Sequence, residues 1–161
     1  MRIIKKSVII IFLLFFTSIY LISNKKFVVN NNTNEPIRAT NFQYASLDTE
    51  PTISEMESYT YRYTLENHKS KVFKVHRNNL LNKILYISID FFYKLEDPEK
   101  EKYYSLKGTT FSSEPQYSKQ SAYCSFQIDV YPNNNTIVTP TRKWGCINPM
   151  YYHKSSLENS E

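Results

Sequence analysis

A run of 17 residues without a charged side chain, Ser7 to Ser23, is the feature that most constrains how this chain can fold. Most of its side chains are Ile, Leu or Phe, and basic residues lie on both sides of it. An apolar stretch of about 17 to 25 residues is long enough to span the hydrocarbon core of a bilayer as a helix. The sequence therefore predicts membrane insertion through residues 7–23.

The end of this run favours an anchor that stays in place. Signal-peptide cores usually have about 7 to 15 residues and end at a cleavage site of small residues. Here the run ends with Tyr20, Leu21, Ile22 and Ser23, with no Ala or Gly. We therefore expect an uncleaved anchor over residues 1–26, and the alternative is a signal cleaved after Ser23. Either way, the chain that follows is carried across the membrane.

Basic residues around the run predict its orientation. Arg2, Lys5 and Lys6 precede it, whereas Lys25 and Lys26 follow it. Because the more basic flank tends to stay in the cytoplasm, the domain after the anchor should face outward. No cysteine lies in or directly after the run, so a lipid-anchored lipoprotein is not indicated.

The net charge of +5 comes from this segment and not from the domain. Five of the 20 basic residues lie in residues 1–26, which have no acidic residue, so the remainder has 15 bases and 15 acids. Nucleic-acid-binding domains normally carry their excess of base on the folded domain, so no nucleic-acid partner is expected. The only two glycines, Gly108 and Gly145, also exclude the usual glycine-rich loops that bind dinucleotides or phosphates.

The rest of the chain predicts one β-rich domain over residues 27–153, followed by a polar tail at 154–161. Residues 59–66 alternate Tyr or Leu with polar residues, and residues 122–131 place Cys124, Phe126, Ile128 and Val130 on one face. Residues 78–85 have helical spacing before a strand-like segment at 86–93, so an α+β fold remains an alternative. We expect a mainly β fold, a small antiparallel sheet or sandwich.

The expected connections between strands are short hairpins. Residues 103–120 are predicted to be mostly irregular. The first predicted hairpin joins residues 27–29 to 37–44 through an Asn-rich turn, and the second joins 59–65 to 71–76 through a turn at 67–70. The third joins 122–131 to 136–144 through Pro132 and the asparagines after it, and Pro140 predicts that its second strand lies at a sheet edge.

The two cysteines are predicted to form a disulfide. Cys124 and Cys146 are an even pair in a chain that we expect to be exported to an oxidising compartment. A turn centred on Asn133 and Asn134 would place Cys124 opposite Lys143, and a kink at Gly145 would bring Cys146 within reach. The alternative is two separate buried thiols.

The sequence favours a binding protein over an enzyme. His68, His76 and His153 belong to no recognisable catalytic or metal-binding motif, and no nucleophile-elbow sequence is present. We therefore expect no catalytic residues, no metal and no cofactor.

One local excess of basic residues marks a candidate binding surface. Residues 62–83 contain six basic residues and one acid, which suits an acidic partner protein or anionic headgroups. The alternative is an ordinary exposed strand face. Exposed aromatic side chains could anchor an interface. The candidate partner-binding residues are Arg62, Lys69, Lys71, Lys74, Arg77, Trp144, Tyr151 and Tyr152.

A family resemblance rests on the apolar anchor and three segments. These are residues 28–37 (VVNNNTNEPI), residues 126–138 (FQIDVYPNNNTIV) and residues 148–152 (NPMYY). Together they resemble small membrane-anchored proteins of Gram-negative bacteria that are found beside type VI secretion phospholipase effectors. The resemblance implies an immunity protein, held in the inner membrane by a single span with its domain in the periplasm, that binds a toxin and blocks its active site. The alternative is an accessory subunit of an envelope secretion or pilus machine.

Overall fold

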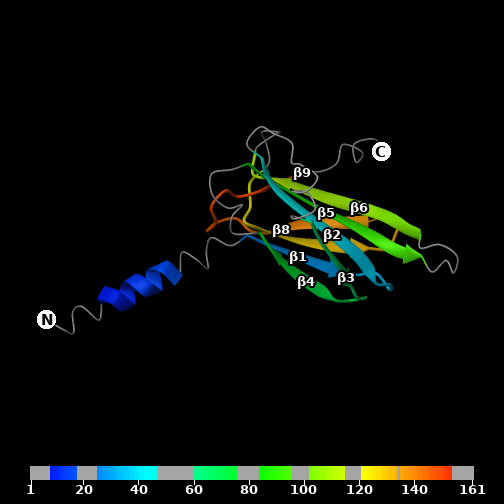
Figure 1. Cartoon of the computed structure of the whole chain (residues 1–161), viewed down its shortest axis with the longest axis horizontal. Coiled ribbons are helices and arrows are strands. Elements are labelled where there is room, and N and C mark those ends of the chain that lie inside the picture. Colours follow the sequence, from blue (N-terminus) through cyan, green and yellow to red (C-terminus); the bar gives the residue numbers. More distant parts are fainter. Residues whose placement is uncertain are drawn as a thin grey trace.

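A computed structural model describes residues 8–17, 25–46, 60–75, 84–95, 102–114, 121–133 and 135–153. Residues 8–17 form a helix, which Figure 1 shows apart from the β-sheets. Among the described residues, no helix has both the length and the apolar character needed to cross a membrane. Of the segment predicted as a short helix or turn, residues 78–85, residues 78–83 lie outside the described residues, and Ile84 and Leu85 belong to a strand. The tail at 154–161 also lies outside the described residues.

The described strands form two stacked sheets, which confirms the mainly β prediction (Figure 1). The four-stranded sheet has the order β4-β1-β7-β8 and the five-stranded sheet the order β3-β2-β5-β6-β9. All neighbours pair antiparallel except β1 and β7, which pair parallel. The strands are β1 (Lys26–Asn31), β2 (Ile37–Ser46), β3 (Thr60–Leu65), β4 (Ser70–Lys74), β5 (Ile84–Leu95), β6 (Lys102–Ser112), β7 (Ser125–Tyr131), β8 (Asn135–Arg142) and β9 (Tyr151–His153).

The core lies between the two sheets, where alternate side chains of each strand point inward. Phe126, Ile128 and Val130 of β7 are buried, as their spacing predicts. Three rings join the sheets: Phe111 of β6 lies 4.9 Å from Phe27 of β1 and 4.7 Å from Phe126, measured between centroids. Aromatic pairs of this kind add about 0.5–1.5 kcal/mol each beyond the area they bury.

The predicted hairpin between residues 27–29 and 37–44 is wrong, because β1 and β2 belong to different sheets. The buried side chain of Asn31 holds the turn between them. Its Nδ2 donates to the carbonyls of Glu35, Leu65 and Glu66 at 2.8, 3.0 and 3.1 Å. Its Oδ1 accepts from the backbone N–H and the hydroxyl of Thr33 at 3.0 and 2.7 Å. The Asn-rich segment is therefore an arch that carries the chain from one sheet to the other.

The predicted hairpin between residues 59–65 and 71–76 is also wrong. β3 pairs with β2, whereas β4 pairs with β1 in the other sheet. The chain turns at His68, which has a φ of 54°, and the N–H of Lys69 donates to the carbonyl of Glu66. The turn residues were placed correctly, but they connect two sheets.

Residues 103–120 are more regular than predicted, since β6 is an eleven-residue strand from Lys102 to Ser112. Its sequence is a weak strand former, and its pairing along the apolar strand β5 holds it extended. The register shifts between Ile89 and Phe91, and Gly108 lies beside this irregularity. A Cβ on Gly108 would displace the carboxylate of Asp90 and would lie 3.2 Å from the carbonyl oxygen of Ile89, a tight approach that glycine avoids.

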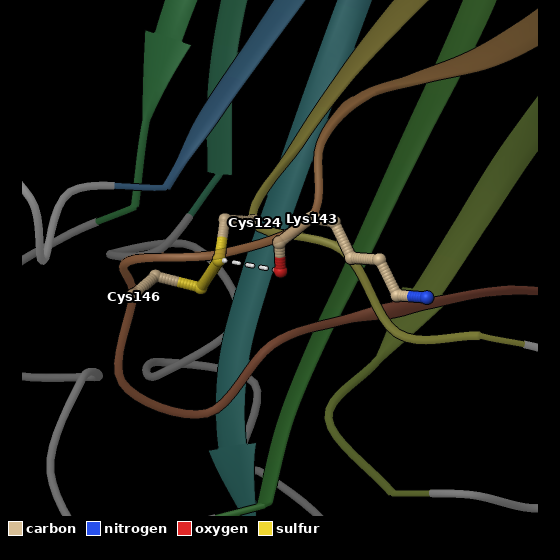
Figure 2. Close-up of a disulfide and its surroundings, with 3 residues drawn as sticks. All are labelled: Cys124, Lys143 and Cys146. Carbon is tan, nitrogen blue, oxygen red and sulfur yellow. Dashed lines mark hydrogen bonds between the residues drawn. A yellow bond between two sulfur atoms is a disulfide. The ribbon is translucent and has the colours of Figure 1, made fainter.

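The β7–β8 hairpin and the disulfide between Cys124 and Cys146 are confirmed (Figure 2). β8 is an edge strand, as Pro140 suggested. Phe126 pairs with Pro140 but Ser125 pairs with Arg142, so Thr141 is an extra residue that shifts the register. This shift brings Sγ of Cys124 to 3.5 Å from the carbonyl oxygen of Lys143. Gly145, with a φ of 82°, makes the predicted kink.

Replacing Asn31 with Ala should destabilise the fold strongly. The change removes five hydrogen bonds at a fully buried position, and at roughly 1 kcal/mol per bond the loss should reach about 3 kcal/mol or more. Asn32→Ala is the matched control, because its Nδ2 makes only a 3.4 Å contact with Asp129. Urea unfolding of the purified chain measures both. Equal losses for the two variants would contradict this role of Asn31.

Removing the disulfide by a Cys124→Ser/Cys146→Ser double change should lower the free energy of unfolding by about 3 kcal/mol, because the bond closes a loop with a sequence separation of 22. Urea unfolding with and without reductant provides the check. The wild-type protein should lose stability on reduction, and the double variant should not respond. Thiol labelling of the unreduced, denatured protein at both cysteines would show that the bond is absent.

Candidate functional site

An open side of the sandwich carries the candidate site. β3 is an edge of the five-stranded sheet and β4 an edge of the four-stranded sheet, and the two edges face each other. Between them lies a groove of about 270 Å³. It is lined by Asn41, Gln43, Tyr61, Arg62, Tyr63, Lys71, Val72, Phe73 and Lys74. We call it the β3–β4 groove.

Strand alternation determines which side chains enter the groove. Tyr63 pairs with buried Ala39, so its ring points toward the interior of the sandwich. On β4, Lys71 pairs with Val29 and Phe73 with Phe27, and both partners are buried core residues. The rings of Tyr63 and Phe73 therefore meet across the two sheets, with centroids 4.7 Å apart, and form an apolar floor.

Two polar atoms in the groove are buried without a hydrogen-bond partner in the described part of the chain. They are Oδ1 of Asn41 and the hydroxyl of Tyr63. A buried polar group without a partner costs about 1–3 kcal/mol, so such groups are uncommon in folded proteins. Burial raises the pKa of Tyr63, which keeps the hydroxyl protonated and able to donate. The groove therefore offers one unused acceptor and one unused donor.

Lys71 supplies the positive charge of the groove. Its Nζ lies 4.5 Å from the centroid of the Tyr63 ring, a cation–π contact that holds the ammonium at the groove mouth. Nε2 of Gln43 donates to the carbonyl of Lys74 at 3.4 Å, which links the two sheets beside it. A carboxylate entering here would meet the ammonium of Lys71, with the buried hydroxyl of Tyr63 and the apolar floor beneath it.

The structure brings together only part of the predicted binding residues. Arg62, Lys71 and Lys74 line the groove, and Lys69 lies in the turn before β4. Arg77 lies outside the described residues. Trp144 lies in the loop after β8. Tyr151 and Tyr152 are on β9, at the far edge of the five-stranded sheet from β3.

Tyr152 belongs to the packing of the domain. Its ring lies 5.6 Å from Phe111, and it packs against the core. Burial also raises the pKa of Tyr152, and it lowers the pKa of the neighbouring His153. Within the described ranges, no three His, Cys, Asp or Glu side chains come together in a way that could hold a metal ion.

Sequence reasoning missed the contribution of β2 to this site. Asn41, which is 1% exposed, and Gln43 both face inward on β2, at positions where strand alternation would suggest apolar residues. Their signal in the sequence is a polar residue at each of two inward positions of a strand. Recognising it requires knowing which face of β2 is buried.

Comparisons with known proteins give only distant likenesses. No family model matches the chain, and no curated protein matches it. Among solved structures, one described as "Trapped Toxin" aligns at a TM-score of 0.40 and 12% identity over 75% of this chain and 24% of its own length. The structure of the human-specific toxin intermedilysin aligns at a TM-score of 0.37 and 8% identity, over 74% of this chain and 23% of its own length. This chain spans about a quarter of the length of both proteins.

Replacing Tyr63 with Phe should leave the free energy of unfolding unchanged or slightly higher. The change removes a buried hydroxyl that has no partner in the described structure and keeps the ring contacts with Phe73 and Lys71. Urea unfolding provides the measurement, and Tyr63→Ala is the control that removes the ring and should cost about 3 kcal/mol. A loss of more than about 1 kcal/mol in Tyr63→Phe would show that the hydroxyl supports the fold.

Proposed function

We propose that this protein is a non-enzymatic, membrane-anchored binding protein whose β3–β4 groove takes an acidic segment of a partner protein. The observation that carries the proposal is a pair of buried polar atoms beside Lys71 that have no hydrogen-bond partner among the residues that the structure describes. A fold gains nothing from burying such groups unpaired, whereas a ligand that pairs them recovers the cost on binding. The proposed partner is a secreted toxin, and the protein would act by occluding its active site.

The anchor is supported by the exposure of the N-terminal helix. Its side chains from Val8 to Phe16 are apolar and each is 56–65% exposed. A continuous apolar surface of this kind is expected to be covered by lipid or another protein. With the basic residues before the helix in the cytoplasm, the domain would lie on the periplasmic side of a bacterial inner membrane. The disulfide fits such an oxidising compartment.

The geometry of the groove favours an acidic side chain over a small neutral ligand. The ammonium of Lys71 and the hydroxyl of Tyr63 are both donors, so together they suit a carboxylate. The free Oδ1 of Asn41 would accept a backbone or side-chain N–H of the same segment. The floor of Tyr63 and Phe73 would contact the apolar part of that segment.

Lys71→Glu should weaken the complex with the toxin encoded beside this gene by tenfold or more, which is about 1.4 kcal/mol. Lys69→Glu makes the same change of charge in the turn, outside the groove lining, and should weaken it far less. The measurement is the Kd of the complex between the toxin and the full-length protein in detergent, at two salt concentrations. Protection of bacterial growth against the toxin is a second readout. Because the contact is ionic, affinity should fall as salt rises.

Two results would contradict the proposal. Absence of a complex with that toxin, together with copurification in a large envelope assembly, would favour the accessory-subunit alternative. Equal losses in Lys71→Glu and Lys69→Glu would show that the groove does not form the interface.

A further inference from the structure

The disulfide holds the loop after β8 at the end of the sandwich where the chain enters from the helix. The N–H of Lys26, the first residue of β1, donates to the carbonyl of Cys124 at 3.3 Å. Cys124 is bonded to Cys146, with their Cα atoms 5.6 Å apart. Figure 1 shows this loop, in orange-red, beside the start of β1. Residues 143–147 therefore lie close to Lys26, at the start of β1.

This loop has an amphipathic surface. Trp144 is 78% exposed and Ile147 is 44% exposed, so two apolar side chains face solvent within four residues. Nζ of Lys143 lies 5.4 Å from the centroid of the Trp144 ring, and Figure 2 shows its side chain directed away from the disulfide. Tryptophan beside lysine is typical of the boundary between lipid and water. Neither Trp144 nor Lys143 contributes to the core.

We propose that the loop of residues 143–147, which we call the disulfide loop, contacts the headgroup layer of the membrane that holds the N-terminal segment. The proposal rests on the proposed membrane anchor. Trp144 and Ile147 enter the boundary layer, while Lys143 reaches the lipid phosphates. The disulfide keeps this loop in place, so the domain is held at the membrane by two contacts and its orientation is restricted.

The reach of the chain allows this contact. Lys26 lies three residue-to-residue steps after Ser23, the end of the apolar run, which corresponds to at most about 10 Å of extended chain. The headgroup layer on each side of the bilayer is about 5–8 Å thick. The end of the domain that carries the disulfide loop therefore cannot move far from the membrane surface.

The charges of the described residues at this end also suit lipid headgroups. Lys26 and Lys74 are paired neighbours on β1 and β4, and both are exposed. Lys143 is exposed on the loop itself. Lys25 is buried, and burial lowers its pKa to about 8. The exposed lysines can contact phosphate groups while the Trp144 ring lies at the level of the headgroups.

Trp144 is the only tryptophan of the chain, so its fluorescence reports on this loop alone. The test uses the full-length protein in vesicles of phosphatidylethanolamine and phosphatidylglycerol, with and without lipids brominated near the headgroup. We expect Trp144 emission to shift to the blue relative to that of the unfolded chain. We also expect strong quenching by the brominated lipids. The quenching constant for acrylamide should be severalfold lower than in the unfolded chain.

A variant places the tryptophan at the end of β8 that is far from the disulfide loop. Trp144→Phe/Ile137→Trp puts the ring on β8 near the turn, at a position already occupied by an exposed apolar residue, about 17 Å along the strand from Arg142. It should show little quenching by brominated lipid. Equal quenching at both positions would overturn the proposal.

Other outcomes separate this inference from the function proposed above. Vesicle flotation of the protein without quenching of Trp144 would keep the anchor and overturn the loop contact. Failure of the protein to float with vesicles would overturn the anchor and the loop contact together, but not the β3–β4 groove. Shielding of Trp144 that appears only when the toxin is added would assign the loop to the protein partner and overturn the lipid contact.

Discussion

The buried side chain of Asn31 is the interaction on which the rest of the domain depends. Its amide pairs with carbonyls of the arch after β1 and of the end of β3, and its oxygen pairs with Thr33. These bonds direct the chain out of one sheet and into the other. β1 is thereby free to pair with β4 on one side and, in parallel, with β7 on the other. This is the first of the crossings between the two sheets that build the sandwich.

The same arrangement creates the β3–β4 groove. Because β3 and β4 follow each other in sequence but lie in different sheets, their edges face each other without hydrogen bonding. The contact of Tyr63 with Phe73 closes the interior between them. Lys71 remains at the opening, above Oδ1 of Asn41 and the hydroxyl of Tyr63, which are buried without a hydrogen-bond partner among the described residues. The proposed site for an acidic segment therefore lies where the two sheets separate.

The features that could be predicted from the sequence are those that depend on nearby residues. The β7–β8 hairpin follows from a regular alternation and a turn of Pro and Asn, and the disulfide follows from that hairpin. The Asn-rich arch and the turn at His68 have the composition of hairpin turns. Whether such a turn joins two strands of one sheet or two sheets depends on partners far away in the chain.

The strand β6 and the inner residues of the groove were missed for the same reason. β6 is held by its pairing with β5, not by its own propensity. Asn41 and Gln43 are polar residues at inward positions, which become visible only when the sheets are in place. The basic residues were found because charge is counted directly, yet of those predicted only Arg62, Lys71 and Lys74 line the groove.

The central claim is that a partner binds across the edges of β3 and β4. Hydrogen exchange of the full-length protein with and without the proposed toxin partner tests it most directly. Outward backbone N–H groups on these edge strands exchange quickly in the free protein unless they are covered. The account predicts protection concentrated in residues 60–65 and 70–74. Protection confined to β9 and the far edge, with none in these two strands, would contradict it.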